Sequence, residues 1–165
     1  MLLDFLSGGN QTNMSDSIWK PHVTVAAMIE QHGKFLVVRE MASGNEVINQ
    51  PAGHLEENES LLEAVIRETL EETQYEFTPT GLQGIYRSIS DDNPEVTYLR
   101  FLFTGEVGEH FNQALDEGII AAEWLSLDEI QACQHRHRSP LVLQCIEDYL
   151  SQSPHSLNVI SQLFA

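Results

Sequence analysis

The sequence predicts an α/β fold in which helices enclose a mixed β-sheet as an α/β/α sandwich. Short runs rich in β-branched residues alternate with turn signals made of Gly, Asn, Asp and Pro, which is typical of antiparallel hairpins. One helical pattern interrupts these runs near residues 60–73, and further helical patterns follow toward the C-terminal end. This order of elements is the one that such a sandwich produces. At 165 residues, the chain has the size of one domain with one core.

The first strands are expected to follow a flexible extension. Residues 1–17 mix Gly, Asn, Ser and Thr, and we interpret them as a flexible N-terminal extension of a domain over residues 18–165. The β-branched run His22–Ile29 predicts a strand, and Gln31–Gly33 is a turn signal before a second strand, Lys34–Glu40. We expect these two strands to pair as a hairpin.

A loop, a short strand and a turn precede the central helix. We expect Met41–Glu46 to be the loop and Val47–Asn49 to be the short strand, which leads into the turn Gln50–Gly53. The proline of this turn fixes its conformation, and the glycine lets the backbone approach a ligand closely.

The elements after the central helix complete the sheet and add helices. We expect strands at Leu82–Ile89, Val96–Glu106 and Ile119–Leu125, a turn at Asp91–Pro94, and helices at Leu127–Cys133, Leu141–Leu150 and Leu157–Phe164. A proline, Pro140, opens the second of these helices, where its missing N–H does no harm.

The central helix carries three carboxylates on one face. Ser60 and Glu63 have the spacing of a capping box, so the helix should start near Ser60. Glu68, Glu71 and Glu72 stand at i, i+3 and i+4, and therefore share one face beside the apolar stripe. The positions of that stripe, which would face the core, are Leu61, Leu62, Val65, Ile66 and Thr69.

These carboxylates suggest a metal site. Like charges at this spacing cost an isolated helix about 0.2–0.5 kcal/mol per pair, so the face calls for a compensating cation, and Arg67 supplies only one. A hard divalent ion such as Mg²⁺ binds carboxylate oxygens together with phosphate oxygens and water. For three glutamates alone, the alternative is a solvated acidic helix face.

The wider spacing resembles the Nudix box, the signature of hydrolases that act on nucleoside diphosphates linked to another moiety. The residues that carry the resemblance are Gly53, Glu59, Arg67, Glu68, Glu71 and Glu72. The resemblance implies a Nudix-type α/β/α sandwich and a hydrolase of phosphoanhydride bonds. Thr69, Gln74 and Tyr75 depart from the family pattern, and Gln74 replaces the glycine that ends the helix in a left-handed turn. None of these departures removes a carboxylate or the arginine.

The resemblance also implies a role for each signature residue. Glu71 and Glu72 would bind Mg²⁺, with Mn²⁺ as a possible substitute, and Glu68 would be a further ligand or the general base. Arg67 would orient the glutamates by paired hydrogen bonds, and Glu59 would add charge or support.

Two further ligands would come from outside these side chains. One is the backbone carbonyl of Ala52, just before the box glycine. The other is a carboxylate beyond the sheet, for which Glu117 is the first candidate, with Asp116 and Glu123 behind it. The alternative for Glu117 is a solvated acid in a turn.

Three residues are candidates for substrate binding. Arg100 lies in an apolar strand, where an uncompensated charge is costly, so it would contact substrate phosphate or pair with an acid. Arg138 belongs to the only basic cluster of an acidic chain, and it would face phosphate or simply be a solvated helix flank. His54 follows the box glycine and would lie at the pocket rim or make a structural hydrogen bond.

Segments between Lys20 and about Tyr149 resemble a bacterial phosphatase of this family. This implies a monomer that releases phosphate from nucleoside di- and triphosphates and from thiamine-pathway pyrophosphates such as hydroxymethylpyrimidine pyrophosphate and thiamine pyrophosphate. Loops Met41–Glu46 and Ser88–Glu95 would set substrate choice. Two alternatives stay open: a Nudix pyrophosphatase acting on ADP-ribose, dinucleotides or oxidised nucleotides, and a non-catalytic acidic binding module.

Composition limits the partners. A net charge of −17 and a pI near 4.5 argue against binding a nucleic-acid polymer, and a small phosphorylated substrate would instead be met by metal. Cys133 and Cys145 lack C-x-x-C or zinc spacing, which indicates two reduced thiols in a cytoplasmic protein. No apolar run approaches the length of a membrane span, so no membrane partner is expected.

Overall fold

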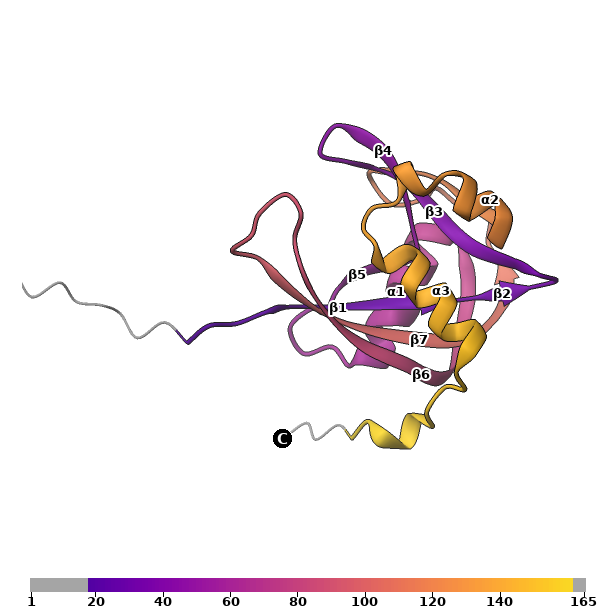
Figure 1. Ribbon diagram of the computed structural model, residues 1–165. Helices are drawn as coiled ribbons and strands as arrows, with labels where there is room; N and C mark the ends of the chain where they lie inside the picture. The colour runs from indigo at the N-terminus through magenta and orange to yellow at the C-terminus, as the bar shows by residue number, and fades with distance from the viewer. Residues whose placement is uncertain (1–17, 162–165) are drawn as a thin grey trace, which may run out of the picture.

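The computed structural model describes residues 18–161, so the predicted extension over residues 1–17 lies outside the described residues (Figure 1). The strands are β1 (His22–Met28), β2 (Glu30–Gln31), β3 (Lys34–Ala42), β4 (Asn45–Asn49), β5 (Ala52–His54), β6 (Tyr75–Ile89), β7 (Thr97–His110) and β8 (Ile119–Ser126). The helices are α1 (Leu61–Thr73), α2 (Leu127–Ala132) and α3 (Leu141–Ser151), with 3₁₀ turns η1 (Gln134–Arg136) and η2 (Leu157–Val159). None of the described helices has the length and apolar character needed to cross a membrane.

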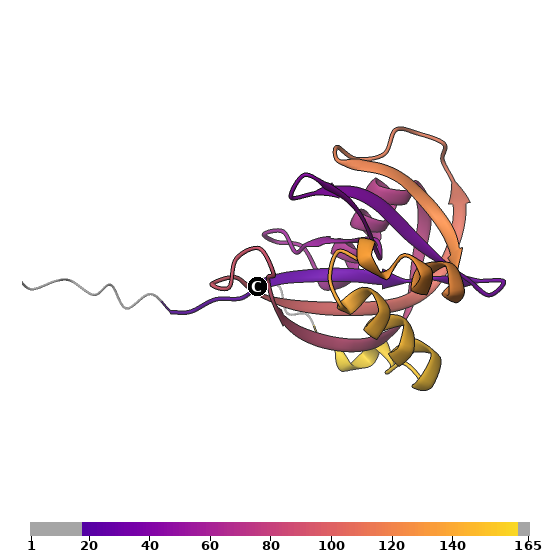
Figure 2. The same cartoon turned by 45° about the horizontal axis from the view of Figure 1, so that its top comes forward.

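The strands form two sheets. The first is mixed and has the order β5-β1-β7-β6, in which β1 is parallel to β7 and the other pairs are antiparallel. In the second, β3 pairs antiparallel with β2, β4 and β8. Figure 2 shows β3 and β8 running above the strands of the mixed sheet.

Helices cover both faces of the mixed sheet, which confirms the sandwich. Alternate residues of β1 point to opposite faces. Ala26 and Met28 pack in one core cluster with Val142 and Ile146 of α3. Their neighbours in β1, and Ile29 just after it, pack in a second cluster with α1: Val25, Ala27 and Ile29 against Ala64 and Val65.

The predicted hairpin of His22–Ile29 with Lys34–Glu40 is wrong, because these two runs lie in different sheets. The short β2, rather than β1, pairs with the start of β3, and β1 instead lies between β5 and β7. From Val25 to Met28, β1 is buried on both faces, so it is a central strand that needs a partner on each side.

Two other predicted segments also differ. Met41–Glu46 is not a loop, because β3 and β4 continue into a two-residue turn at Ser43 and Gly44, whose φ angles of 49° and 81° match a type I′ hairpin. The long β6 starts directly after α1 at Tyr75, and its register shifts hid this extension from the alternation pattern.

The predicted helix Leu157–Phe164 is only the 3₁₀ turn η2 as far as residue 161, and its last residues lie outside the described range. In α1, the capping box of Ser60 and Glu63 is confirmed. The core-facing stripe is rotated from the predicted one: Ile66 is 39% exposed, and Ala64 is fully buried in its place. A small residue at this position lets the helix approach the sheet closely.

Gln74 ends α1 in the left-handed conformation that the family glycine would adopt, with φ 60° and ψ 15°. Its backbone N–H donates to the carbonyl of Leu70. Its side-chain amide donates to the carbonyls of Leu70 and Ala114, at 3.1 and 3.0 Å, and so fastens the segment before β8 to the helix end. The missing glycine therefore leaves the helix exit unchanged in shape.

Replacing Gln74 by alanine is expected to destabilise the fold by about 1 kcal/mol more than replacing it by glycine. Both changes remove the same side-chain hydrogen bonds, but only alanine keeps a Cβ in the left-handed region. Urea denaturation of the two variants measures the difference. Equal stabilities would show that the turn stores no conformational strain.

Candidate active site

The free edge of β5 faces α1. The hydrogen bonds from Ala27 N–H to the Pro51 carbonyl and from Leu55 N–H to the Val23 carbonyl show that odd-numbered residues of this segment bond to β1. The backbone groups of Ala52 and His54 therefore point the other way, toward the helix.

Two residues of α1 bind this edge. The carboxylate of Glu72 accepts the N–H of Ala52 at 2.8 Å, and the guanidinium of Arg67 donates to the carbonyl of His54 at 3.1 Å. The carbonyl of Ala52, the predicted metal ligand, lies on the same edge as the N–H that Glu72 binds.

Gly53 permits a close approach between β5 and the helix. The position of a Cβ at residue 53 falls 2.1–2.2 Å from the carboxylate atoms of Glu68, far inside van der Waals contact. Because Gly53 pairs with Val25, whose side chain faces α1, any side chain at residue 53 would enter the space that Glu68 fills. The structure thus brings the carboxylates of Glu68 and Glu72 against consecutive residues of β5.

Arg67 contacts three of the predicted glutamates. It donates two hydrogen bonds to Glu59, at 2.7 and 2.9 Å, and its Nη1 donates to Glu68 at 2.7 Å and to Glu71 at 3.0 Å. These bonds hold the pKa of Glu59 below its ordinary value. Arg67 therefore has the contacts of a residue that orients the carboxylates.

Among the described residues, no cation forms an ion pair with Glu72. It is 8% exposed, and burial raises its pKa to about 8, an effect increased by the nearby carboxylates of Glu40, Glu68 and Asp116. Burial also raises the pKa of Glu68, against the opposing effect of Arg67. The excess of buried negative charge and the oxygen-only donor set fit a hard divalent cation.

Within residues 18–161, no three acidic, histidine or cysteine side chains already stand close enough together to coordinate an ion. Two of the predicted ligands, Glu68 and Glu71, instead accept hydrogen bonds from the guanidinium of Arg67. The fit to a cation therefore rests on the chemistry of the donors and on the buried carboxyl of Glu72, whose ionised form a cation would stabilise.

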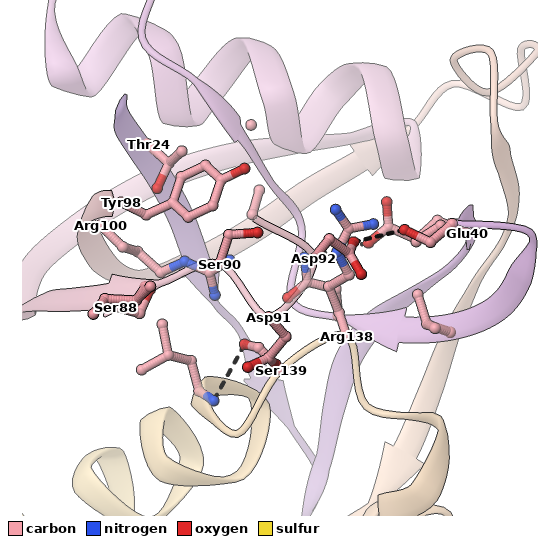
Figure 3. A pocket seen from close by; sticks show the side chains of 18 of the residues that line it. Thr24, Glu40, Ser88, Ser90, Asp91, Asp92, Tyr98, Arg100, Arg138 and Ser139 are labelled. Atoms are coloured by element: carbon pink, nitrogen blue, oxygen red, sulfur yellow. Dashed lines mark hydrogen bonds between the residues drawn. The ribbon is translucent and has the colours of Figure 1, made fainter. Parts of the chain in front are cut away.

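A cavity of about 400 Å³ adjoins this edge on the face of the sheet opposite α1 (Figure 3). The residues of its floor are neighbours across paired strands. His54, Thr24 and Arg100 form one row across β5, β1 and β7, and Tyr98 lies in the next row beside Ser88. Ala52 and Gly53 also line the cavity, so the carboxylates of α1 lie just behind its wall.

All three predicted substrate-binding residues line this cavity: Arg100, Arg138 and His54. Arg100 is in no ion pair among the described residues, and its Nη1 is buried without a hydrogen-bond partner there. Burial lowers the pKa of Arg100, while the charges of Glu40 and Glu72 act in the opposite direction.

Arg138 and His54 lie at different parts of the rim. Arg138 is placed by its backbone N–H, which donates to the carbonyl of Ile48 at 2.9 Å. The ring of His54 lies among those of His22 and Tyr98, with centroids 5.8 and 6.2 Å away. Burial and the neighbouring His22 lower the pKa of His54, which favours the neutral imidazole.

The two segments expected to set substrate choice meet over the cavity. The hydroxyl of Ser43, in the β3–β4 turn, donates to the carboxylate of Asp92 at 2.6 Å. Both residues line the cavity, together with other residues of the same two segments. The contact joins parts of the chain that are far apart in sequence and closes one side of the cavity.

Glu117, the first candidate for the carboxylate outside the box, lies in the turn before β8. Glu117 and the adjacent Asp116 are both exposed. The charge of Asp116 contributes to the raised pKa of Glu72, and the Asp116 N–H donates to the carbonyl of Glu71. Glu123 instead pairs with Arg39 at 3.1 Å. Glu40 was not predicted from the sequence. It lines the cavity, and of the neighbouring carboxylates it raises the pKa of Glu72 the most.

Glu40 lies near the end of β3. In the sequence it is only a charged residue after the apolar part of that strand, so nothing marked it as part of a site. Thr24, Asn49 and Tyr98 line the cavity and were also missed. Their residue types are common in strands, so nothing local marked them.

Comparison with known proteins agrees with this geometry. The model of the NUDIX domain matches residues 19–144. The chain is 40% identical over 144 residues to phosphatase NudJ of Escherichia coli K12, an alignment that covers 87% of this chain and 92% of NudJ. It is 49% identical to a NUDIX hydrolase of Nitrosomonas europaea, with a TM-score of 0.84 and coverage of 87% and 98%. A MutT NUDIX hydrolase of Burkholderia pseudomallei, 18% identical, shares the fold, with a TM-score of 0.67 and coverage of 79% and 98%. The chain therefore belongs to the Nudix hydrolase family.

Proposed function

We propose that this Nudix hydrolase is a magnesium-dependent phosphatase. Its substrates would be nucleoside di- and triphosphates and thiamine-pathway pyrophosphates, such as hydroxymethylpyrimidine pyrophosphate and thiamine pyrophosphate, from which it releases phosphate. The similarity to the phosphatase NudJ, which extends over 92% of that protein, supports the reaction. The observation that carries the proposal is the meeting of Glu68 and Glu72 with consecutive residues of β5, beside a cavity that holds Arg100.

Four groups would hold Mg²⁺, or Mn²⁺ in its place: the carboxylates of Glu68, Glu71 and Glu72, and the carbonyl of Ala52. When bound, the ion would neutralise phosphate oxygens and acidify the attacking water. Glu117, the predicted ligand from outside the box, stays a candidate. Glu40 is better placed than Glu117 for this role, because it lines the cavity and its charge raises the pKa of Glu72.

The remaining side chains would bind and orient the substrate. Arg100 offers a buried, unpartnered N–H to a phosphate oxygen, and the burial of a cation in the cavity floor strengthens such a bond. Arg138 and His54 would contact the substrate at the rim. Glu68 would serve as a ligand or as the general base, held in either role by its hydrogen bond from Arg67.

Replacing Arg67 by lysine is expected to lower kcat about tenfold, because outer groups that orient metal ligands contribute on this scale. A lysine keeps the charge but cannot bind Glu59, Glu68 and Glu71 at once with a planar fork. Steady-state kinetics at saturating Mg²⁺ measure the loss, and replacing the exposed Lys34 by arginine is the control. An unchanged kcat would show that charge alone suffices at this position.

A product assay tests the proposed function directly. The protein is incubated with Mg²⁺ and a panel of nucleotides, hydroxymethylpyrimidine pyrophosphate and thiamine pyrophosphate, and the released species are separated. Release of inorganic phosphate supports the proposal. Release of pyrophosphate or of a nucleoside monophosphate from ADP-ribose or a dinucleotide would favour the alternative pyrophosphatase. No turnover of any compound would favour a non-catalytic binding module.

We also propose that the protein is a cytoplasmic monomer. Cys133 and Cys145 are both free thiols, as a reducing compartment requires. Light scattering coupled to size-exclusion chromatography measures the mass against the 18.6 kDa of one chain.

A further inference from the structure

Arg100 lines the cavity floor without a counter-charge bound to it (Figure 3). It forms no ion pair among the described residues, and its Nη1 is buried there without a hydrogen-bond partner. A long, flexible side chain that binds a phosphate well must be held in one orientation before the phosphate arrives. The side chains packed around the guanidinium therefore decide how well it can act.

The strand register places Tyr86 next to Arg100. Tyr86 of β6 pairs with Arg100 of β7, and Thr24 of β1 pairs with Arg100 on the other side. The Cβ atoms of such cross-strand pairs are about 4.5–5.5 Å apart, so the Tyr86 ring is within reach of the guanidinium. Thr24 lines the cavity, whereas Tyr86 does not. Along this row the cavity floor ends at Arg100, and Tyr86 is the side chain behind it.

Helix α3 fixes the Tyr86 ring. The hydroxyl of Tyr86 donates to the carboxylate of Asp148 at 2.9 Å, and burial raises the pKa of Tyr86, which keeps the hydroxyl a donor. The other carboxylate oxygen of Asp148 accepts from the amides of Gln144 and Gln152, at 3.1 and 3.4 Å, so the carboxylate is itself held in place. The ring beside Arg100 is thus tied to the helix at its far end.

Cys145 adds a second, uncharged contact from α3. It lies one helical turn before Asp148, is fully buried and packs in one core cluster with Tyr86. Burial has the largest effect on the pKa of both Cys145 and Arg100, and each of these groups also acts on the pKa of the other. Burial raises the pKa of Cys145 to about 11, so it is a neutral thiol near pH 7. A phenol and a thiol behind Arg100 leave its positive charge available to a phosphate.

We propose that Tyr86 is a positioning residue for the hydrolysis: tied to α3 by Asp148, it holds the guanidinium of Arg100 toward the substrate phosphate. Cys145 completes this support without neutralising the guanidinium. The inference rests on the proposed function, in which Arg100 binds phosphate, and it extends that role to residues that do not contact the substrate.

Tyr86→Phe keeps the ring and removes its bond to Asp148. It should raise the KM for ADP about tenfold at unchanged kcat, because a loosened guanidinium loses part of a charge-assisted bond made to the phosphate throughout the reaction. Asp148→Ala breaks the same bond from α3 and should raise KM equally. Tyr149→Phe is the matched control: this tyrosine packs in the same cluster, with its ring against Phe35, and its loss should leave KM unchanged.

A double-mutant cycle separates positioning from packing. Arg100→Met should raise KM, and adding Tyr86→Phe to it should cause no further rise. A purely structural role would instead lower the melting temperature and impair both backgrounds equally, which would overturn the inference. An unchanged KM in Tyr86→Phe or in Arg100→Met would also overturn it. Circular dichroism checks that each variant folds, and Tyr86→Phe carries the test if Asp148→Ala does not.

Calorimetric binding of ADP in EDTA gives a readout that does not depend on turnover. Tyr86→Phe and Arg100→Met should both bind ADP more weakly than the wild type. That result, combined with no turnover of any compound by the wild type, would refute the proposed function and leave this inference standing. Equal ADP affinity of the wild type and Tyr86→Phe, with phosphate release intact, would overturn the inference and leave the proposed function standing.

Discussion

Replacing Glu72 by glutamine (E72Q) is expected to lower magnesium-dependent hydrolysis on the order of 10²–10³-fold, while making the metal-free protein more stable. Glutamine has the same shape and can still accept the N–H of Ala52, so the fold keeps its contact between α1 and β5. It lacks the negative charge that would hold an ion beside the substrate phosphates. The activity loss is measured by phosphate release at saturating Mg²⁺.

The stability gain of E72Q over the wild type should increase with pH, because burial of Glu72 disfavours its ionised form. Burial raises the pKa of Glu72 from its ordinary value of 4.5 to about 8, so the folded state holds a proton that the unfolded chain releases. Ionisation of the folded protein is then unfavourable, and wild-type stability falls as pH rises from about 4.5 to about 8. Glutamine does not titrate, so E72Q should gain about 1 kcal/mol at pH 5 and about 4 kcal/mol at pH 8.

Denaturation of both proteins in EDTA at several pH values measures this gap. The matched control is the replacement of the exposed Glu57 by glutamine, which removes an acid from the loop before α1. It should change neither the activity nor the pH dependence of stability. A gap that is independent of pH would show that Glu72 is not held as a buried acid. Wild-type turnover by E72Q would remove it from the proposed ligand set.

The site could be predicted as far as its parts are local in sequence. Glu68 and Glu72 are one helical turn apart, so helical geometry alone places them on one face. The capping box of Ser60 and Glu63 is likewise a contact between residues of one turn, and it was predicted at its observed position. Such features depend on backbone geometry that is the same in every helix.

Features that depend on which strands become neighbours could not be predicted. Glu40 raises the pKa of Glu72 although it lies on β3, in a different sheet from β5, whose Ala52 N–H Glu72 binds. Thr24 and Arg100 are adjacent because β1 pairs in parallel with β7, a partner that no alternation pattern identifies. The predicted hairpin of β1 with β3 failed for the same reason, since the burial of β1 on both faces reveals a central strand but not its partners.

Gly53→Ala is expected to lower kcat about 100-fold with little loss of stability, because misplacement of a catalytic group by about 1 Å costs activity on this scale. A Cβ at residue 53 would stand 2.1–2.2 Å from the carboxylate of Glu68. That carboxylate is the far end of a flexible side chain, so it can move aside without disturbing the backbone. The clash is then relieved by displacement of the Glu68 carboxylate, which disturbs the site, while the backbone and the stability of the fold are preserved.

Gly105→Ala is the contrasting control. A Cβ there would meet the backbone carbonyl of Thr78 at 2.3 Å and the ring of Phe77 at 2.5 Å, neither of which can swing away. This variant should lose stability in thermal denaturation and keep its kcat at temperatures where it is folded, the reverse of Gly53→Ala.

A double-mutant cycle identifies Glu68 as the group that Gly53→Ala displaces. Glu68→Ala removes the carboxylate and opens the space beside residue 53, so adding Gly53→Ala to it should cause no further loss of kcat. Phosphate release by the wild type, the two single variants and the double variant provides the four values needed. Additive losses would mean that the methyl group acts on the substrate or on β5 itself, and that the close approach at Gly53 serves a purpose other than seating Glu68.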